Sequence, residues 1–138
     1  MNGNQSARLG AAIFAFGACA CGAAFGADMA VTLSGENEVP AVTTPAAGTG
    51  TISVGDDGSV SGSVTTTGVQ GSMAHIHIAA AGKNGPVIIP LKKDGDTYSV
   101  PDGAKLNADQ MEAFKSGGLY VNVHSAAHPG GEIRAQLQ

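Results

Sequence analysis

The chain from residue 29 onward alternates apolar and polar side chains, and this pattern predicts short β-strands. Successive residues of a strand face opposite sides of a sheet, so the alternation gives one apolar face and one polar face. In the clearest case Ile52 and Val54 alternate with Thr and Ser, and Asp56-Asp57-Gly58 is a hairpin turn sequence. Strands are expected at residues 29–34, 50–54, 59–65, 73–79, 87–91, 98–100, 119–124 and 132–137.

One short helix is expected before the last two strands. Asn107 is a suitable N-cap, and Gln110 stands three residues later, which is the spacing of a capping box. Leu106 and Met111 have the spacing of a hydrophobic staple, and Gly117 suits the C-terminal end. About seven or eight strands with one helix predict an all-β fold, an antiparallel Greek-key or immunoglobulin-like β-sandwich or barrel.

Residues 1–27 have the pattern of a secretory signal peptide. Arg8 supplies a positive charge, residues 9–20 are apolar or small, and Ala24-Phe25-Gly26 permits cleavage after Gly26. The apolar stretch is short for a bilayer, although an uncleaved anchor is the alternative. We therefore expect one domain at residues 28–138, periplasmic or secreted, with no transmembrane span in the mature chain.

Both cysteines lie in this first segment. Cleavage after Gly26 would remove Cys19 and Cys21 and leave a domain without a disulfide or a thiolate ligand. The small residues before Cys19 leave a lipoprotein open, anchored through Cys19 or Cys21, although Phe16 stands where such signals usually have Leu.

Charge narrows the range of partners. Charged residues make up 13% of the 138 residues, and the formal net charge is −4. A charge-poor, weakly acidic chain has no positive surface for phosphate backbones, so we do not expect a nucleic acid partner. A protein partner in the cell envelope stays open.

The histidines are the chemically most informative residues. His75 and His77 are two residues apart in an expected strand, so their side chains share one face, opposite Ala74 and Ile76. His124 ends another strand of the same design. If the two strands are neighbours, three imidazoles meet on one patch.

Such a patch suits a transition metal. Imidazole binds copper and zinc, and without cysteine an all-nitrogen site favours copper, with zinc as the second choice. His128 could be a fourth ligand, and the thioether of Met73, on the face of His75, is a soft donor. Glu36 and Glu38 could be oxygen ligands or hydrogen-bond acceptors for the imidazole rings. Histidines on a strand can instead be purely structural, bonded to backbone carbonyls.

Five segments in order carry a family resemblance. They are residues 33–40 (LSGENEVP), 74–77 (AHIH), 84–87 (NGPV), 119–124 (LYVNVH) and 129–137 (PGGEIRAQL). They resemble the CHRD domain, a module named from repeats in chordin and widespread in bacterial exported proteins. Ile78 and Ala135 stand where glycine is common in that family. The resemblance implies a β-sandwich and an extracytoplasmic location, but no general activity.

Three functions therefore fit the sequence. The first is an exported metal-binding domain, for copper storage, delivery or resistance, with ligands His75, His77 and His124. The second is a copper enzyme of superoxide dismutase type, since the histidine arrangement is similar to the copper ligands of Cu,Zn superoxide dismutase. The glycine-rich electrostatic loop, bridging histidine and paired cysteines of that enzyme are not recognisable here. The third is a non-catalytic adhesion or protein-interaction module.

Overall fold

The structure is a computed structural model that describes residues 26–138. Most of the expected signal peptide, including Cys19 and Cys21, lies outside the described residues. The described residues form nine strands: β1 (Ala27–Ser34), β2 (Ala47–Val54), β3 (Val60–Thr67), β4 (Gly71–Ile78), β5 (Val87–Pro90), β6 (Lys92–Asp94), β7 (Thr97–Ser99), β8 (Leu119–Ser125) and β9 (Ile133–Leu137). A 3-10 helix η1 (Gly35–Asn37) follows β1, and an α-helix α1 (Ala108–Lys115) precedes β8.

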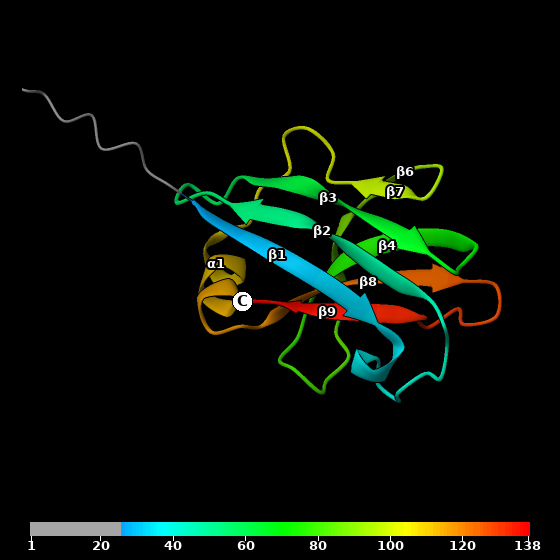
Figure 1. Ribbon diagram of the computed structural model, residues 1–138. Coiled ribbons are helices and arrows are strands. Elements are labelled where there is room, and N and C mark those ends of the chain that lie inside the picture. The colour runs from blue at the N-terminus through cyan, green and yellow to red at the C-terminus, as the bar shows by residue number, and fades with distance from the viewer. Residues whose placement is uncertain (1–25) are drawn as a thin grey trace, which may run out of the picture.

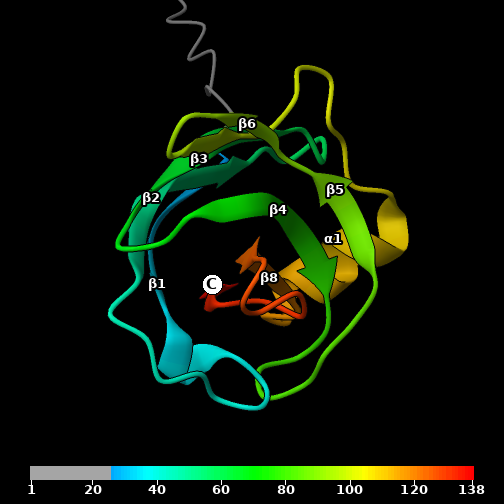
Figure 2. The same ribbon diagram turned by 90° about the vertical axis from the view of Figure 1, so that its right-hand side faces the viewer.

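All nine strands form one antiparallel sheet in the order β5-β4-β8-β9-β1-β2-β3-β7-β6. The two ends of this order are consecutive in the chain, separated by Leu91 alone. The Leu91 amide donates to the carbonyl of Ala74 at 3.0 Å, so the segment that pairs with β4 continues directly into the strand that pairs with β7. The sheet thus curls into a nearly closed barrel (Figures 1 and 2). The all-β prediction is confirmed, and of its two architectures the barrel is the one formed.

The barrel interior is filled by the apolar face of each strand. Ile52, Val64, Val121 and Leu137 are among the side chains with no exposed surface. Aliphatic residues and alanine dominate this core, as the scarcity of aromatic residues requires.

Helix α1 packs its partly buried Met111 and Phe114 against this core. The capping box is present: the Asn107 side chain accepts from the Gln110 amide at 2.8 Å, and the Gln110 side chain accepts from the Asn107 amide at 2.9 Å. Within residues 26–138, none of the helices has the length and apolar character needed to cross a membrane.

Neighbouring strands β4, β8 and β9 carry polar side chains on their outer face. Cross-strand register places His75 beside Asn122 and Asn122 beside Arg134. The next row places His77 beside Tyr120. Two loops lie on the same side of the molecule, residues 35–46 with η1 and residues 79–86 (Figures 1 and 2). The loops are joined by a bond of 2.8 Å from the Asn84 side chain to the carbonyl of Val39.

Candidate metal centre

The outer face of β4, β8 and β9 forms a second, polar core beneath the two loops. His77, Asn122, His124 and Arg134 are all less than a tenth exposed. Buried polar groups need hydrogen-bond partners, and the loops supply many of them through backbone carbonyls. On this side of the barrel the two loops cover these polar side chains and shield them from solvent.

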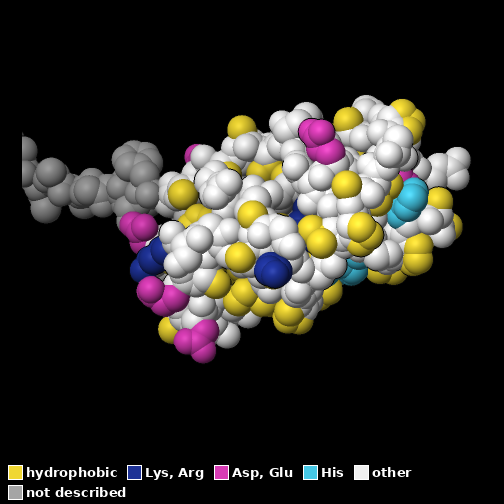
Figure 3. Space-filling model, turned by 90° about the horizontal axis from the view of Figure 1, so that it is seen from below, with side chains coloured by type: hydrophobic (Ala, Val, Ile, Leu, Met, Phe, Trp, Pro, Cys, Tyr) yellow, Lys and Arg dark blue, Asp and Glu magenta, His cyan; other side chains and the backbone are white. Residues whose placement is uncertain are grey.

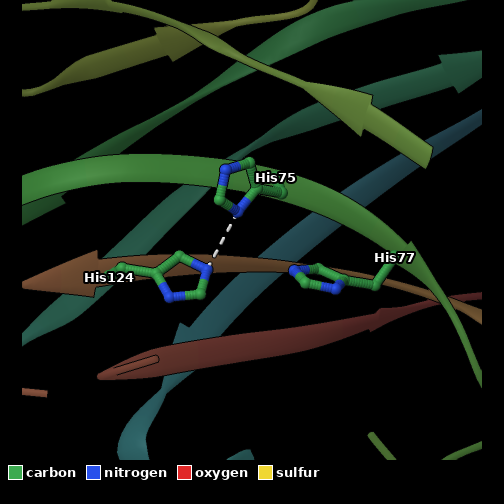
Figure 4. Close-up of side chains that lie close together, drawn as sticks. All are labelled: His75, His77 and His124. Carbon is green, nitrogen blue, oxygen red and sulfur yellow. Dashed lines mark hydrogen bonds between the residues drawn. The ribbon is translucent and has the colours of Figure 1, made fainter. Parts of the chain in front are cut away.

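Three histidines meet in this layer. His75 and His77 project from β4, and His124 projects from β8 toward them (Figure 4). Nδ1 of His75 lies 3.0 Å from Nε2 of His124. One nitrogen from each of the three rings lies within 4.8 Å of the corresponding nitrogens of the other two. These residues are referred to below as the histidine cluster.

Backbone carbonyls fix the orientation of two of the rings. Nδ1 of His124 lies 2.9 Å from the carbonyl oxygen of Pro129, and Nδ1 of His77 lies 2.8 Å from that of Gly85. Since a carbonyl only accepts, each Nδ1 must carry the proton in its neutral ring. Nε2 of both rings then presents a lone pair to the centre of the cluster. Metal-binding histidines are commonly oriented in this way.

One of those lone pairs lacks a donor. Nε2 of His77 is buried, and no described residue makes a hydrogen bond with it; Oδ1 of Asn122 is buried and unpaired in the same way. Asn122 lies close enough to the His77 ring to favour its protonated form. With the ring neutral, neither of these two atoms has a proton donor among the described residues. A cation at this position would satisfy the lone pair of His77.

The distances fit a shared ion after a small adjustment. Three nitrogens bound to one ion at about 2.0–2.1 Å in a trigonal or tetrahedral arrangement lie about 3.3–3.6 Å apart, so the widest pair would need to close by about 1.2–1.5 Å. The pair at 3.0 Å already matches two neighbouring positions of a coordination sphere. The movement must bring His77 and His124 together, since their ring centroids, 6.0 Å apart, are the widest-spaced of the three pairs.

His77 is held further by a stack of planar groups. Its ring lies parallel to that of Tyr120, with an interplanar angle of 2° and centroids 4.7 Å apart. The guanidinium carbon of Arg134 lies 3.4 Å from the centroid of Tyr120. The Arg134 guanidinium donates to the Asn84 side chain and the Lys83 carbonyl, and the Tyr120 hydroxyl accepts from the Gly85 amide. The 79–86 loop and β8 together immobilise the ring.

Burial favours the neutral form of His75 and His77. It lowers the pKa of His75 and of His77, in each case mainly because the charged ring is removed from water. The nearby imidazoles lower the pKa of His75 further. Neutral imidazole is the form that binds metal, so the folded chain favours the competent state.

Burial has the opposite effect on Glu38, whose pKa it raises. This carboxylate accepts from the Asn122 side chain at 3.4 Å, and it is not an acceptor for an imidazole ring. Glu36 lines a groove of ≈ 520 Å³ between β1 and β9, together with Glu38 and Arg134. The acceptors for the rings are therefore backbone carbonyls rather than the two glutamates.

The other candidate ligands lie around the cluster. His128 lies in the turn after β8, where its amide donates to the Ser125 hydroxyl at 3.1 Å, and it is not one of the three gathered histidines. Met73 lies on β4 opposite His124 and is 50% exposed. Figure 3 shows histidine at the surface beside hydrophobic side chains.

Three features of the site were not predicted from the sequence. The carbonyls of Gly85 and Pro129 and the ring of Tyr120 orient the imidazoles. Asn84-Gly85-Pro86 is recognisable as a turn sequence, but its placement over β8 depends on long-range packing. For Tyr120 a signal was available, because it shares the strand face of His124.

A family model matches nearly all of this barrel. The match is to the CHRD domain and spans residues 29–137. The chain belongs to the CHRD domain family. This CHRD domain matches none of the curated proteins and none of the solved structures with which it was compared. The predicted resemblance is thereby confirmed, and the function must be inferred from the chemistry of the site.

Proposed function

We propose that this CHRD domain binds one transition metal ion, copper in preference to zinc, through His75, His77 and His124. The observation that carries the proposal is the buried Nε2 of His77, which has no donor and lies beside two further imidazoles. The cluster contains neither a thiolate nor a carboxylate, and a purely nitrogen set suits copper better than the harder divalent ions.

The role we infer is storage, delivery or resistance outside the cytoplasm. Its location rests on the sequence alone, on the positive charge and apolar run of residues 1–27. A protein that receives or supplies the ion in the envelope would be its natural partner.

Competition titrations with Cu(II) and Zn(II) test the proposal. The full chain would carry Cys19→Ser and Cys21→Ser in every variant, so that thiols do not bind the metal. We expect one Cu(II) per chain with a Kd tighter than about 1 μM, and a loss of about a hundredfold or more in a His75→Ala, His77→Ala variant. The matched control is His128→Ala, which should stay within about threefold of the parent.

Two results would reject the proposal: no binding tighter than about micromolar, or equal affinity in the double variant and the parent. A superoxide turnover assay on the loaded protein separates a binding protein from an enzyme. Bound copper without turnover is the result that the proposed function expects.

A further inference from the structure

Two large apolar side chains are exposed in the described part of the chain, and both flank the histidine cluster. Met73 is 50% exposed and Val87 is 47% exposed. Met73 pairs with His124 across the β4–β8 ladder, and Val87 pairs with His77 across the β4–β5 ladder. Cross-strand partners point to the same face, so the two apolar groups stand at opposite sides of the cluster.

Met73 shares the strand face of the cluster and follows an irregularity in the β4–β8 ladder. The β4–β8 register shifts between Gly71 and Met73, and bulges of this kind re-aim the side chain that follows them. Met73 lies two residues before His75 and therefore on the same strand face. Directly paired residues have Cβ atoms about 4.5–5.5 Å apart, so a flexible thioether can reach the nitrogens of a neighbouring imidazole.

Charge at the cluster favours a monovalent ion. The three gathered side chains are imidazoles without a carboxylate or thiolate, and the buried guanidinium of Arg134 lies over the Tyr120 ring, which stacks in turn on His77. A positive charge repels a divalent cation twice as strongly as a monovalent one at the same distance. Thioether sulfur is a soft donor that selects Cu(I) rather than Zn(II).

Resting on the proposed function, we infer that Met73 is a fourth ligand and that Cu(I) is the form of copper this site carries. The sulfur closes the exposed side of the cluster, while His77 and His124 form the buried side. A thioether exchanges readily because it bears no charge, so this side is also where a donor or acceptor of Cu(I) would reach the ion.

Cu(I) and Zn(II) titrations of matched variants test the assignment, under anaerobic conditions with a chromogenic Cu(I) chelator as competitor. Met73→Leu keeps the size and apolar character of the side chain and removes only the sulfur. Val87→Ala, at the other side of the cluster, controls for loss of apolar cover. All variants carry Cys19→Ser and Cys21→Ser.

We expect Met73→Leu to weaken Cu(I) binding by about tenfold or more and to leave Zn(II) affinity within about threefold, with Val87→Ala changing neither. X-ray absorption of the Cu(I)-loaded parent should contain a copper–sulfur component that Met73→Leu lacks. Unchanged Cu(I) affinity in Met73→Leu, or equal losses for both metals, overturns the assignment while the histidine site stands. If the parent binds neither metal, the proposed function itself fails and the assignment fails with it.

Discussion

At the scale of single residues, the described part of the chain keeps a buried imidazole nitrogen that receives no hydrogen bond from it. This nitrogen is Nε2 of His77, whose ring is fixed by a hydrogen bond to the Gly85 carbonyl and by a stack on Tyr120. An unsatisfied buried acceptor costs about 1–3 kcal/mol of folding free energy, which a structural histidine would avoid by turning. Folding therefore leaves this nitrogen available for a ligand.

The His77→Phe variant should lose Cu(II) binding while keeping most of its folding stability. The phenyl ring keeps the stack with Tyr120 and removes the unpaired Nε2, but it loses the bond to Gly85. These effects oppose each other, so the free energy of unfolding should change by no more than about 1 kcal/mol, while Cu(II) binding is lost. Urea denaturation and a metal titration measure the two quantities. A loss of stability above about 3 kcal/mol would mean that His77 is a structural residue.

The lowered pKa values of His75 and His77 predict how stability depends on pH. As the pH falls below about 6.5, the unfolded chain takes up protons at these rings before the folded chain does. The contribution of these two rings to folding stability is therefore complete above about pH 6.5 and is lost as the pH falls below it. The metal-free protein should melt at a lower temperature at about pH 5.5 than at about pH 7.5. Glu38, whose pKa is raised, acts in the opposite sense. Comparing the parent with a His75→Gln, His77→Gln double variant isolates the contribution of these two rings. An identical pH dependence of the melting temperature in both proteins would contradict the lowered pKa values of His75 and His77.

Strand alternation predicted which residues share a face, because it depends only on the period of the backbone. His75 and His77 point away from Ala74 and Ile76, as that period requires. The sequence does not reveal where an imidazole N–H finds its acceptor. The carbonyls of Gly85 and Pro129 come from loops whose paths are set by packing.

At the scale of secondary structure, one ladder and one loop build the site. The β4–β8 register brings His124 to the histidines of β4, and the 79–86 loop aims His77. A Cβ on Gly85 would lie 1.9 Å from the carbonyl oxygen of Ile78, so the loop can approach β4 only with glycine there.

Gly85→Ala should therefore disturb the site through the loop. We expect Cu(II) affinity to fall by about tenfold or more, because the carbonyl that orients His77 must move. Gly130→Ala is the control, since a Cβ there meets nothing within 4 Å and the backbone needs no positive φ. Equal affinities in the two variants would show that the loop does not position the ring.

The capping box of α1 is remote from the histidine cluster and tests local stability alone. Asn107→Ala should lower the free energy of unfolding by about 1 kcal/mol, and Asn107→Gly by only a few tenths. Neither should change metal affinity. Urea denaturation checks the first expectation, and a weaker metal affinity in either variant would contradict the second.

Eight of the nine strands and the helix were predicted, because each has its own alternation or cap. The exception is β6, Lys92–Asp94. Its three residues are all exposed and polar, so the sequence has no apolar–polar alternation there that would predict a strand. It forms because β7 pairs with it, at Lys93↔Tyr98 for example. Such a strand depends on its neighbour rather than on its own residues.

At the scale of the whole molecule, the nearly closed sheet forms the floor of the site. The stretch from Val87 to Asp94 pairs with β4 and then with β7, which closes the order of strands. Closure could not be predicted from the sequence, because it follows from the direct passage of β5 into β6 through Leu91 and not from any strand pattern. The family could be predicted, since its motifs are local and ordered.

Pulsed electron paramagnetic resonance of the Cu(II)-loaded protein tests the central claim most directly, because it counts the imidazoles coupled to the ion. We expect one Cu(II) per chain with three coupled imidazoles, and loss of this signal in a variant with His75, His77 and His124 each replaced by alanine. His128→Ala should give the spectrum of the parent. An unchanged spectrum in the triple variant would contradict the account.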